Sequence, residues 1–160
     1  MTVPIKVSAD GGTPLVISTS NPTVLLQGTC GSARGFRTKR FELRSNNPGA
    51  SQQIVTLQLV TYATGTAGGT TVTATPKDQA LNGVYTPSTT FKANTTTLGT
   101  TPTVVKAWQW NTANIEDQVD GLLELQEEFT AGKVFAFLIT PAPGASLSVT
   151  ATLHGEEGLG

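Results

Sequence analysis

The chain has 160 residues, of which 38% are hydrophobic and 13% charged, and ten Lys and Arg against eleven Asp and Glu give a formal net charge of -1 at pH 7. A charged fraction about half of the usual one in four excludes coiled-coil and highly charged disordered classes. Because a near-neutral chain has no overall field to draw it onto DNA or an anionic membrane, we expect no nucleic-acid partner and no membrane partner. The length favours a single domain spanning residues 1–160.

The first nine residues alternate between apolar and polar side chains, with Val3 and Ile5 among the apolar ones. This alternation predicts either a simple first strand or an N-terminal arm, within residues 1–12, that adds to the sheet edge of a neighbouring molecule. In the arm hypothesis Val3, Ile5 and Lys6 contact the partner.

Clusters of Gly, Pro and Asn divide the rest of the chain into roughly seven to nine short segments rich in β-branched residues, which is typical of strands. The stronger candidates are 15–18, 24–27, 36–44, 53–61, 104–110, 133–140 and 146–153, and the weaker ones are 70–75 and 124–129. The run 134–139 is apolar throughout, which predicts a strand that is central in its sheet or covered on both sides.

Two segments are predicted as connections. Residues 76–102 are rich in Thr, Asn, Gly and Pro and indicate a long loop, which in a compact domain is functional or pinned by a neighbour. Residues 114–128 indicate a loop followed by a strand. The spacing of the strands predicts an all-β fold, a two-sheet antiparallel sandwich with Greek-key or jelly-roll connections.

Reactive side chains are scarce, because the sequence holds one histidine, His154, and one cysteine, Cys30. No nucleophile elbow, phosphate-binding glycine loop, zinc-protease pair or dinucleotide fingerprint occurs in it. We therefore expect no enzyme, no metal and no cofactor.

Parts of the chain resemble a known group of proteins. The run Ala131-Gly-Lys-Val-Phe-Ala-Phe-Leu-Ile-Thr140, the Pro/Gly turn after it, the alternating segment 145–153 and the acids Glu156 and Glu157 resemble the last two strands of small auxiliary virion proteins of tailed bacteriophages. The segment 68–78 is similar to their strand that runs into a Thr-Pro-x-Asp link.

The resemblance implies a jelly-roll domain that decorates or cements an icosahedral head. The partners it implies are the major capsid protein and further copies of the chain, with a homotrimer as the expected state. The expected location is the capsid surface of the virion after synthesis in the host cytoplasm. The absence of a charged and then apolar leader at the start of the sequence agrees with this expectation.

Half of the basic residues fall within eleven positions: Arg34, Arg37, Lys39, Arg40 and Arg44. Strict strand alternation would place Arg37 and Lys39 on the face of Phe41, with Arg40 and Arg44 on the other, which is not a one-sided comb for phosphates. The cluster indicates either a solvated edge strand or a salt-bridged contact with an acidic partner surface, and a nucleic-acid contact is the least favoured alternative.

Acidic residues gather in a later segment, and Glu116, Asp117 and Asp120 are the candidates there for capsid or inter-subunit contact. Opposite charges on two segments suggest pairing, either inside one subunit or between copies. A calcium site at Asp117, Asp120 and Glu124 is the alternative, although the spacing lacks the EF-hand pattern.

Trp108 and Trp110 lie two residues apart and therefore share one strand face. Burial in a core or subunit interface is the commoner explanation for such a pair. If the indoles are exposed, they form a stacking platform for a sugar ring, and the chain is a carbohydrate-binding jelly roll involved in host recognition.

Overall fold

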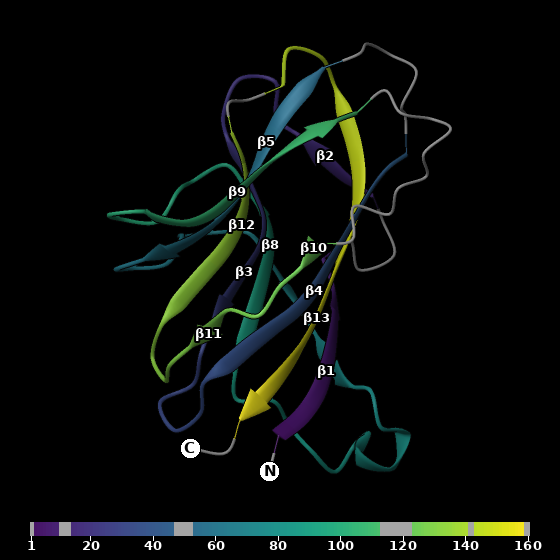
Figure 1. Ribbon diagram of the computed structural model, residues 1–160, viewed down its shortest axis with the longest axis vertical. Helices are drawn as coiled ribbons and strands as arrows, with labels where there is room; N and C mark the ends of the chain where they lie inside the picture. The colour runs from purple at the N-terminus through teal and green to yellow at the C-terminus, as the bar shows by residue number, and fades with distance from the viewer. Residues whose placement is uncertain (1, 10–13, 47–52, 113–122, 141–142, 159–160) are drawn as a thin grey trace.

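The computed structural model describes residues 2–9, 14–46, 53–112, 123–140 and 143–158, and these residues form two antiparallel β-sheets that face each other (Figure 1). Sheet A has seven strands: β1 (Thr2–Ser8), β2 (Leu15–Ile17), β4 (Phe36–Ser45), β7 (Ala74–Pro76), β10 (Leu123–Glu124), β11 (Glu128–Phe129) and β13 (Leu147–Gly158). Sheet B has six: β3 (Thr23–Thr29), β5 (Ile54–Tyr62), β6 (Thr70–Val72), β8 (Thr90–Thr95), β9 (Thr103–Asn111) and β12 (Val134–Thr140).

A short 3-10 helix, η1 (Gln79–Leu81), follows β7. Within the described residues, no helix is long and apolar enough to cross a membrane.

The strand pairings define a jelly roll. In sheet A, β1 pairs with β13, β13 with β4, and β4 with β10 and β11. In sheet B, β3 pairs with β12, β12 with β5, and β5 with β9. The first strand thus lies beside the last. Successive strands of the series alternate between the two sheets except for β5 and β9, which pair within sheet B, as in a double Greek key. The predicted all-β, two-sheet antiparallel sandwich is confirmed.

Strands β6, β7 and β8 form an insertion between β5 and β9. The predicted strand 70–75 is instead two strands that meet at Thr73, because β6 pairs with β8 in sheet B whereas β7 pairs with β1 in sheet A. The predicted loop 76–102 contains β8, which pairs with β3 and has Phe91 and Ala93 in the core. The sequence pattern did not indicate β8, because Phe91 and Ala93 are its only apolar residues and the other four are Thr, Lys or Asn.

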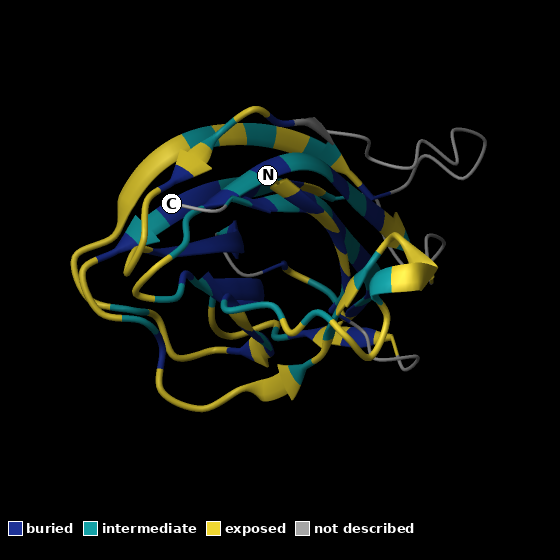
Figure 2. Ribbon diagram, turned by 90° about the horizontal axis from the view of Figure 1, so that it is seen from below, coloured by how far each residue is buried: buried dark blue, intermediate teal, exposed yellow. Residues whose placement is uncertain are grey.

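Residues Thr2–Ser8 form a strand of the domain and not an arm, because β1 has a hydrogen-bonded neighbour on each side. Val3 is 7% exposed and Ile5 is 0% exposed, so neither is available for contact with a partner. Lys6 points the other way and is exposed, as the alternation of a strand requires. Figure 2 shows such alternating bands on several strands of the sandwich, whereas β3 and β12 are buried over six successive residues.

Strand β12 confirms the prediction for 134–139, because it lies between β3 and β5 and all six residues are buried. Phe135 and Phe137 face sheet A, where Phe137 stacks on Phe41 at 3.9 Å between ring centroids. On the opposite face, Val134, Ala136 and Leu138 belong to a second apolar cluster. Burial of each large side chain stabilises the fold by about 1.5–3 kcal/mol.

Candidate functional site

The outer surface of sheet A carries most of the candidate contact residues and is called here the charged face. A β-bulge creates it. Thr38 of β4 pairs with Gly155 of β13, and Arg40 pairs with the adjacent His154. Lys39 between them has no partner on β13 and is the extra residue of the bulge. The bulge shifts the alternation by one position, and Phe41 after it points inward, as Phe36 does before it. All four basic side chains of β4 therefore lie outside the core: Arg37, Lys39, Arg40 and Arg44.

This arrangement corrects the expectation that Arg37 and Lys39 share a face with Phe41. Strict alternation fails here because the bulge places two consecutive residues, Lys39 and Arg40, on the same side of the strand. The basic residues of β4 are a one-sided row after all.

Acidic side chains from neighbouring strands pair with two of these cations. Arg37 forms an ion pair with Glu128 on β11. The Nζ atom of Lys39 lies 3.4 Å from Oε2 of Glu156, which belongs to β13. Such exposed pairs contribute about 0–1 kcal/mol each, so they fix side-chain positions more than they stabilise the fold.

Arg40 and Arg44 are the other two basic residues of β4. A guanidinium nitrogen of Arg40 lies 2.6 Å from Oε1 of Glu42 on the same strand. Arg44 is exposed and forms no ion pair with any acid in the described ranges. The acids that the sequence singled out, Glu116, Asp117 and Asp120, lie outside the described residues, as does the loop predicted around them.

Arg34 precedes β4 and takes part in a buried network that the sequence analysis missed. Its Nη1 atom donates a 2.9 Å hydrogen bond to the hydroxyl of Tyr85 and lies 3.7 Å from Oε2 of Glu157. The Glu157 carboxylate is 0% exposed. A signal for this burial was present, because alternation along β13 from Leu147 places Glu157 on the same face as Leu153.

The Glu157 carboxylate accepts hydrogen bonds from the segment between β7 and β8, which is part of the insertion. Oε1 accepts a hydrogen bond from the Ser88 hydroxyl at 2.8 Å. It accepts two more from Thr89, one from the backbone N–H at 2.6 Å and one from the hydroxyl at 2.7 Å. Oε2 accepts from the Ser88 backbone N–H at 3.0 Å and from the Tyr85 hydroxyl. Burial acts to raise the pKa of Glu157, but these hydrogen bonds outweigh it and hold that pKa below its ordinary value.

The network is structural in its consequence. It ties residues 85–89 to the end of the last strand, so the segment expected to be pinned by a neighbour is pinned within its own chain. Arg34 is engaged in this internal contact while its side chain stays 30% exposed.

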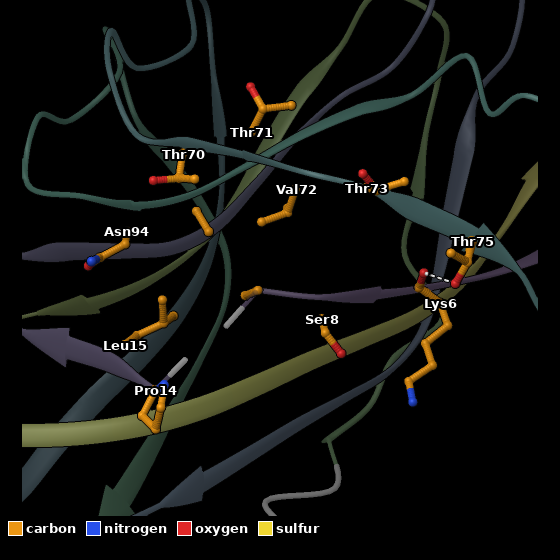
Figure 3. Close-up of a pocket in the computed structure, with 12 residues that line it drawn as sticks. Lys6, Ser8, Pro14, Leu15, Thr70, Thr71, Val72, Thr73, Thr75 and Asn94 are labelled. Atoms are coloured by element: carbon orange, nitrogen blue, oxygen red, sulfur yellow. Dashed lines mark hydrogen bonds between the residues drawn. The ribbon is translucent and has the colours of Figure 1, made fainter. Parts of the chain in front are cut away.

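A groove of about 720 Å³ opens at the edge of the sandwich, between β1 and β2 of sheet A and β6 and β8 of sheet B (Figure 3). Hydroxyl, amide and ammonium groups on its lining come from Lys6, Ser8, Thr70, Thr71, Thr73, Thr75 and Asn94. Val72 and Leu15 supply apolar surface. The Thr75 hydroxyl donates a 3.3 Å hydrogen bond to the backbone oxygen of Lys6, which joins β7 to β1 within sheet A beside the groove.

The tryptophans belong to the core side of β9. Trp108 pairs with Leu57 and Trp110 with Val55, both of which are buried, and the two indoles are half-buried and pack against the main core. This position does not give the exposed sheet-face platform that sugar stacking requires. Lys106, on the same face, reaches Glu127 with 2.7 Å between Nζ and Oε1.

Burial shifts the pKa values of the two scarce reactive residues in opposite directions. Burial raises the pKa of Cys30 to about 11, so its thiol is protonated at neutral pH. Burial, followed by the charge of Lys77, lowers the pKa of His154. Within the described ranges no three His, Cys, Asp or Glu side chains gather as metal ligands would.

Comparison with known protein families, curated proteins and solved structures finds no match for this chain.

Proposed function

We propose that this chain is a structural virion protein that binds the outer surface of a bacteriophage capsid as a homotrimer and stabilises the shell. The proposal is supported above all by the charged face, where a bulge turns the basic side chains of β4 to one side of a jelly-roll sandwich. The resemblance of the C-terminal strands to auxiliary virion proteins gives the class of partner. Because a fold alone does not define a function, the charged face carries the proposal.

The mechanism is binding without chemistry. A protein that binds only the assembled shell stabilises that shell by mass action. Many copies on a symmetric lattice, each with several contacts, multiply a modest affinity through avidity. Rigid strands suit this role because their backbone is already ordered before binding.

Arg44 and Lys6 are the groups of the charged face best placed for a partner. Both are exposed, and neither forms an ion pair with an acid in the described part of the chain. Arg37, Lys39 and Arg40 are already paired, so an acidic partner has to compete with Glu128, Glu156 or Glu42 for them.

Co-sedimentation with empty shells tests the proposal, using the major capsid protein encoded by the same genome. We expect binding that weakens with added salt and a trimeric mass for the free protein in light scattering. Arg44→Glu should weaken binding without disturbing an internal ion pair, whereas Lys133→Glu, an exposed lysine after β11, is the matched control. Failure to bind shells, or binding unchanged by Arg44→Glu and by Arg37→Glu with Arg40→Glu, would remove the charged face from the account.

Carbohydrate recognition is a second candidate function, and the groove favours it. Threonine and serine hydroxyls, the Asn94 amide and apolar surface at Val72 and Leu15 form a lining suited to a sugar. In a glycan array, this function predicts signals that Thr71→Val and Thr73→Val reduce and that Trp108→Phe leaves in place. An array without signals would end this candidate.

A further inference from the structure

The centre of the charged face holds a row of basic residues that lie abreast on three adjacent strands. Lys6 on β1 pairs in register with His154 on β13, and His154 pairs with Arg40 on β4. Directly opposed side chains on one sheet face lie about 4.5–5.5 Å apart at their Cβ atoms. Lys77 extends the row beyond β1, since its backbone N–H donates a 2.9 Å hydrogen bond to Pro4. We call Lys6, His154, Arg40 and Lys77 the basic row.

Among the side chains that the structure describes, little negative charge meets the basic row. Glu42 is the one carboxylate among the charged groups that act most strongly on His154, and the others are Lys77, Arg40 and Lys6. Oε1 of Glu42 is shared, at 2.6 Å from Arg40 and 3.1 Å from Nε2 of His154. Glu124 stands opposite Arg40 on β10, and its side chain is outside the described part of the structure.

The cations Lys77, Arg40 and Lys6 of the basic row repel one another around His154. Burial and then these charges lower the pKa of His154, so the imidazole between them is neutral at pH 7. Both ring nitrogens of His154 and the Nε atom of Arg40 are buried without a hydrogen-bond partner, so the Glu42 oxygen is near the imidazole but not aligned with it. An anionic group placed over Lys6 and Lys77 would relieve this repulsion.

The surroundings of the basic row favour an isolated carboxylate over a continuous polyphosphate. Glu42 and Glu156 stand beside it on the same face. A nucleic-acid backbone that follows the strand would bring successive phosphates against these acids, whereas one or two carboxylates from a protein segment fit between them.

We propose that the basic row binds carboxylate groups of an acidic protein segment, with the ammonium groups of Lys6 and Lys77 as the accessible contacts. The inference rests on the proposed function to the extent that this segment belongs to the capsid surface. Arg40 adds positive charge beside them although its guanidinium is paired with Glu42, and the neutral imidazole of His154 lies between Arg40 and Lys6.

The single histidine of the chain makes the test direct, because the proton on its Cε1 atom gives one unambiguous NMR signal that can be titrated with pH. The probe is capped hexaglutamate, added to the full chain. We expect saturable binding that raises the pKa of His154, since the carboxylates offset the lysine charges that help to lower it. The double variant Lys6→Gln, Lys77→Gln should weaken the peptide by about tenfold or more, equivalent to about 1.4 kcal/mol.

The matched control is Lys92→Gln with Lys133→Gln, which removes the same charge from other elements. Equal weakening in both double variants, or a His154 titration that the peptide does not move, would overturn the site. A stronger response to a single-stranded oligonucleotide would assign it to nucleic acid instead, and an equal response to inorganic phosphate would show adventitious ion binding only.

This test separates the two proposals. Peptide binding at the basic row together with no binding to shells would leave the site standing and reject the capsid as its partner. Shell binding that Lys6→Gln with Lys77→Gln leaves unchanged would reject the site and keep the proposed function.

Discussion

Thr89 donates two hydrogen bonds to one carboxylate oxygen of Glu157, through its backbone nitrogen at 2.6 Å and its hydroxyl at 2.7 Å. The two residues are 68 positions apart, and the contact joins the start of β8 to the end of β13. Tyr85 and Ser88 complete the coordination of the carboxylate. The insertion is thus held by an ionised group that lies entirely out of solvent.

Glu157→Gln is expected to lower the free energy of unfolding by about 1–3 kcal/mol, because the amide nitrogen cannot accept the hydrogen bonds that reach one of the carboxylate oxygens. Urea unfolding followed by circular dichroism measures this change. Glu156→Gln is the matched control one residue away, since it breaks only the half-exposed pair with Lys39 and should cost about 0–1 kcal/mol. Equal effects of the two variants would show that the Glu157 network is not a stabilising contact.

The same carboxylate predicts a pH dependence. The folded-state pKa of Glu157 lies below its ordinary value of 4.5, so the contribution of this group to stability is fully present above about pH 4.5 and is lost as the pH falls through the folded-state value. Urea unfolding at a series of pH values should therefore show a steeper acid loss in the wild type than in Glu157→Gln. Parallel curves for the two proteins would contradict the assignment of an ionised Glu157.

Gly155→Ala is expected to destabilise the bulge by about 1–3 kcal/mol. A Cβ atom at Gly155 would overlap the Phe36 ring and approach the backbone oxygen of Arg37 to 2.7 Å, and the backbone cannot move without breaking the β4–β13 pairing. Gly158→Ala serves as the control on the same strand, because a Cβ there meets nothing within 4 Å. Thermal unfolding distinguishes them, and a Gly155→Ala protein as stable as the wild type would mean that the Phe36 ring relocates freely.

Cys30 should not react in the native protein. Its pKa of about 11, against an ordinary 9.0, leaves about a hundredfold less thiolate, and the side chain is 3% exposed. Ellman's reagent at pH 8 should label the chain slowly in buffer and rapidly in concentrated guanidinium. Rapid labelling of the native state would indicate frequent local opening around Phe129, whose carbonyl accepts from the thiol at 3.8 Å.

The sequence pattern predicted those strands whose apolar residues repeat without interruption. Alternation from Leu147 to Leu153 and the apolar run ending at Ile139 correspond to β13 and β12. The two-sheet sandwich followed from the number and spacing of such segments. These patterns lie within one segment of the sequence, so such strands can be predicted without knowing which strands they pair with.

The rest depended on pairing between distant segments. The bulge at Lys39 is set by its register against His154 and Gly155, and strict alternation within β4 alone gives the wrong face for its basic residues. Burial of Glu157 required groups from Tyr85 to Thr89, which the sequence marks only as a loop. Charge and polarity show that a residue can bind something, and only the fold shows what it binds.

The pairing of β1 with β13 has a consequence for how the molecule is made. Thr2 stands opposite Gly158, so the start of β1 and the end of β13 lie together at one end of the sandwich (Figure 1). A ribosome must therefore finish β13 before β1 can acquire its main hydrogen-bonded neighbour, and contacts of this sequence separation slow folding. The first strand waits with its apolar side chains uncovered, which makes this interval the period when nascent chains are most prone to associate wrongly.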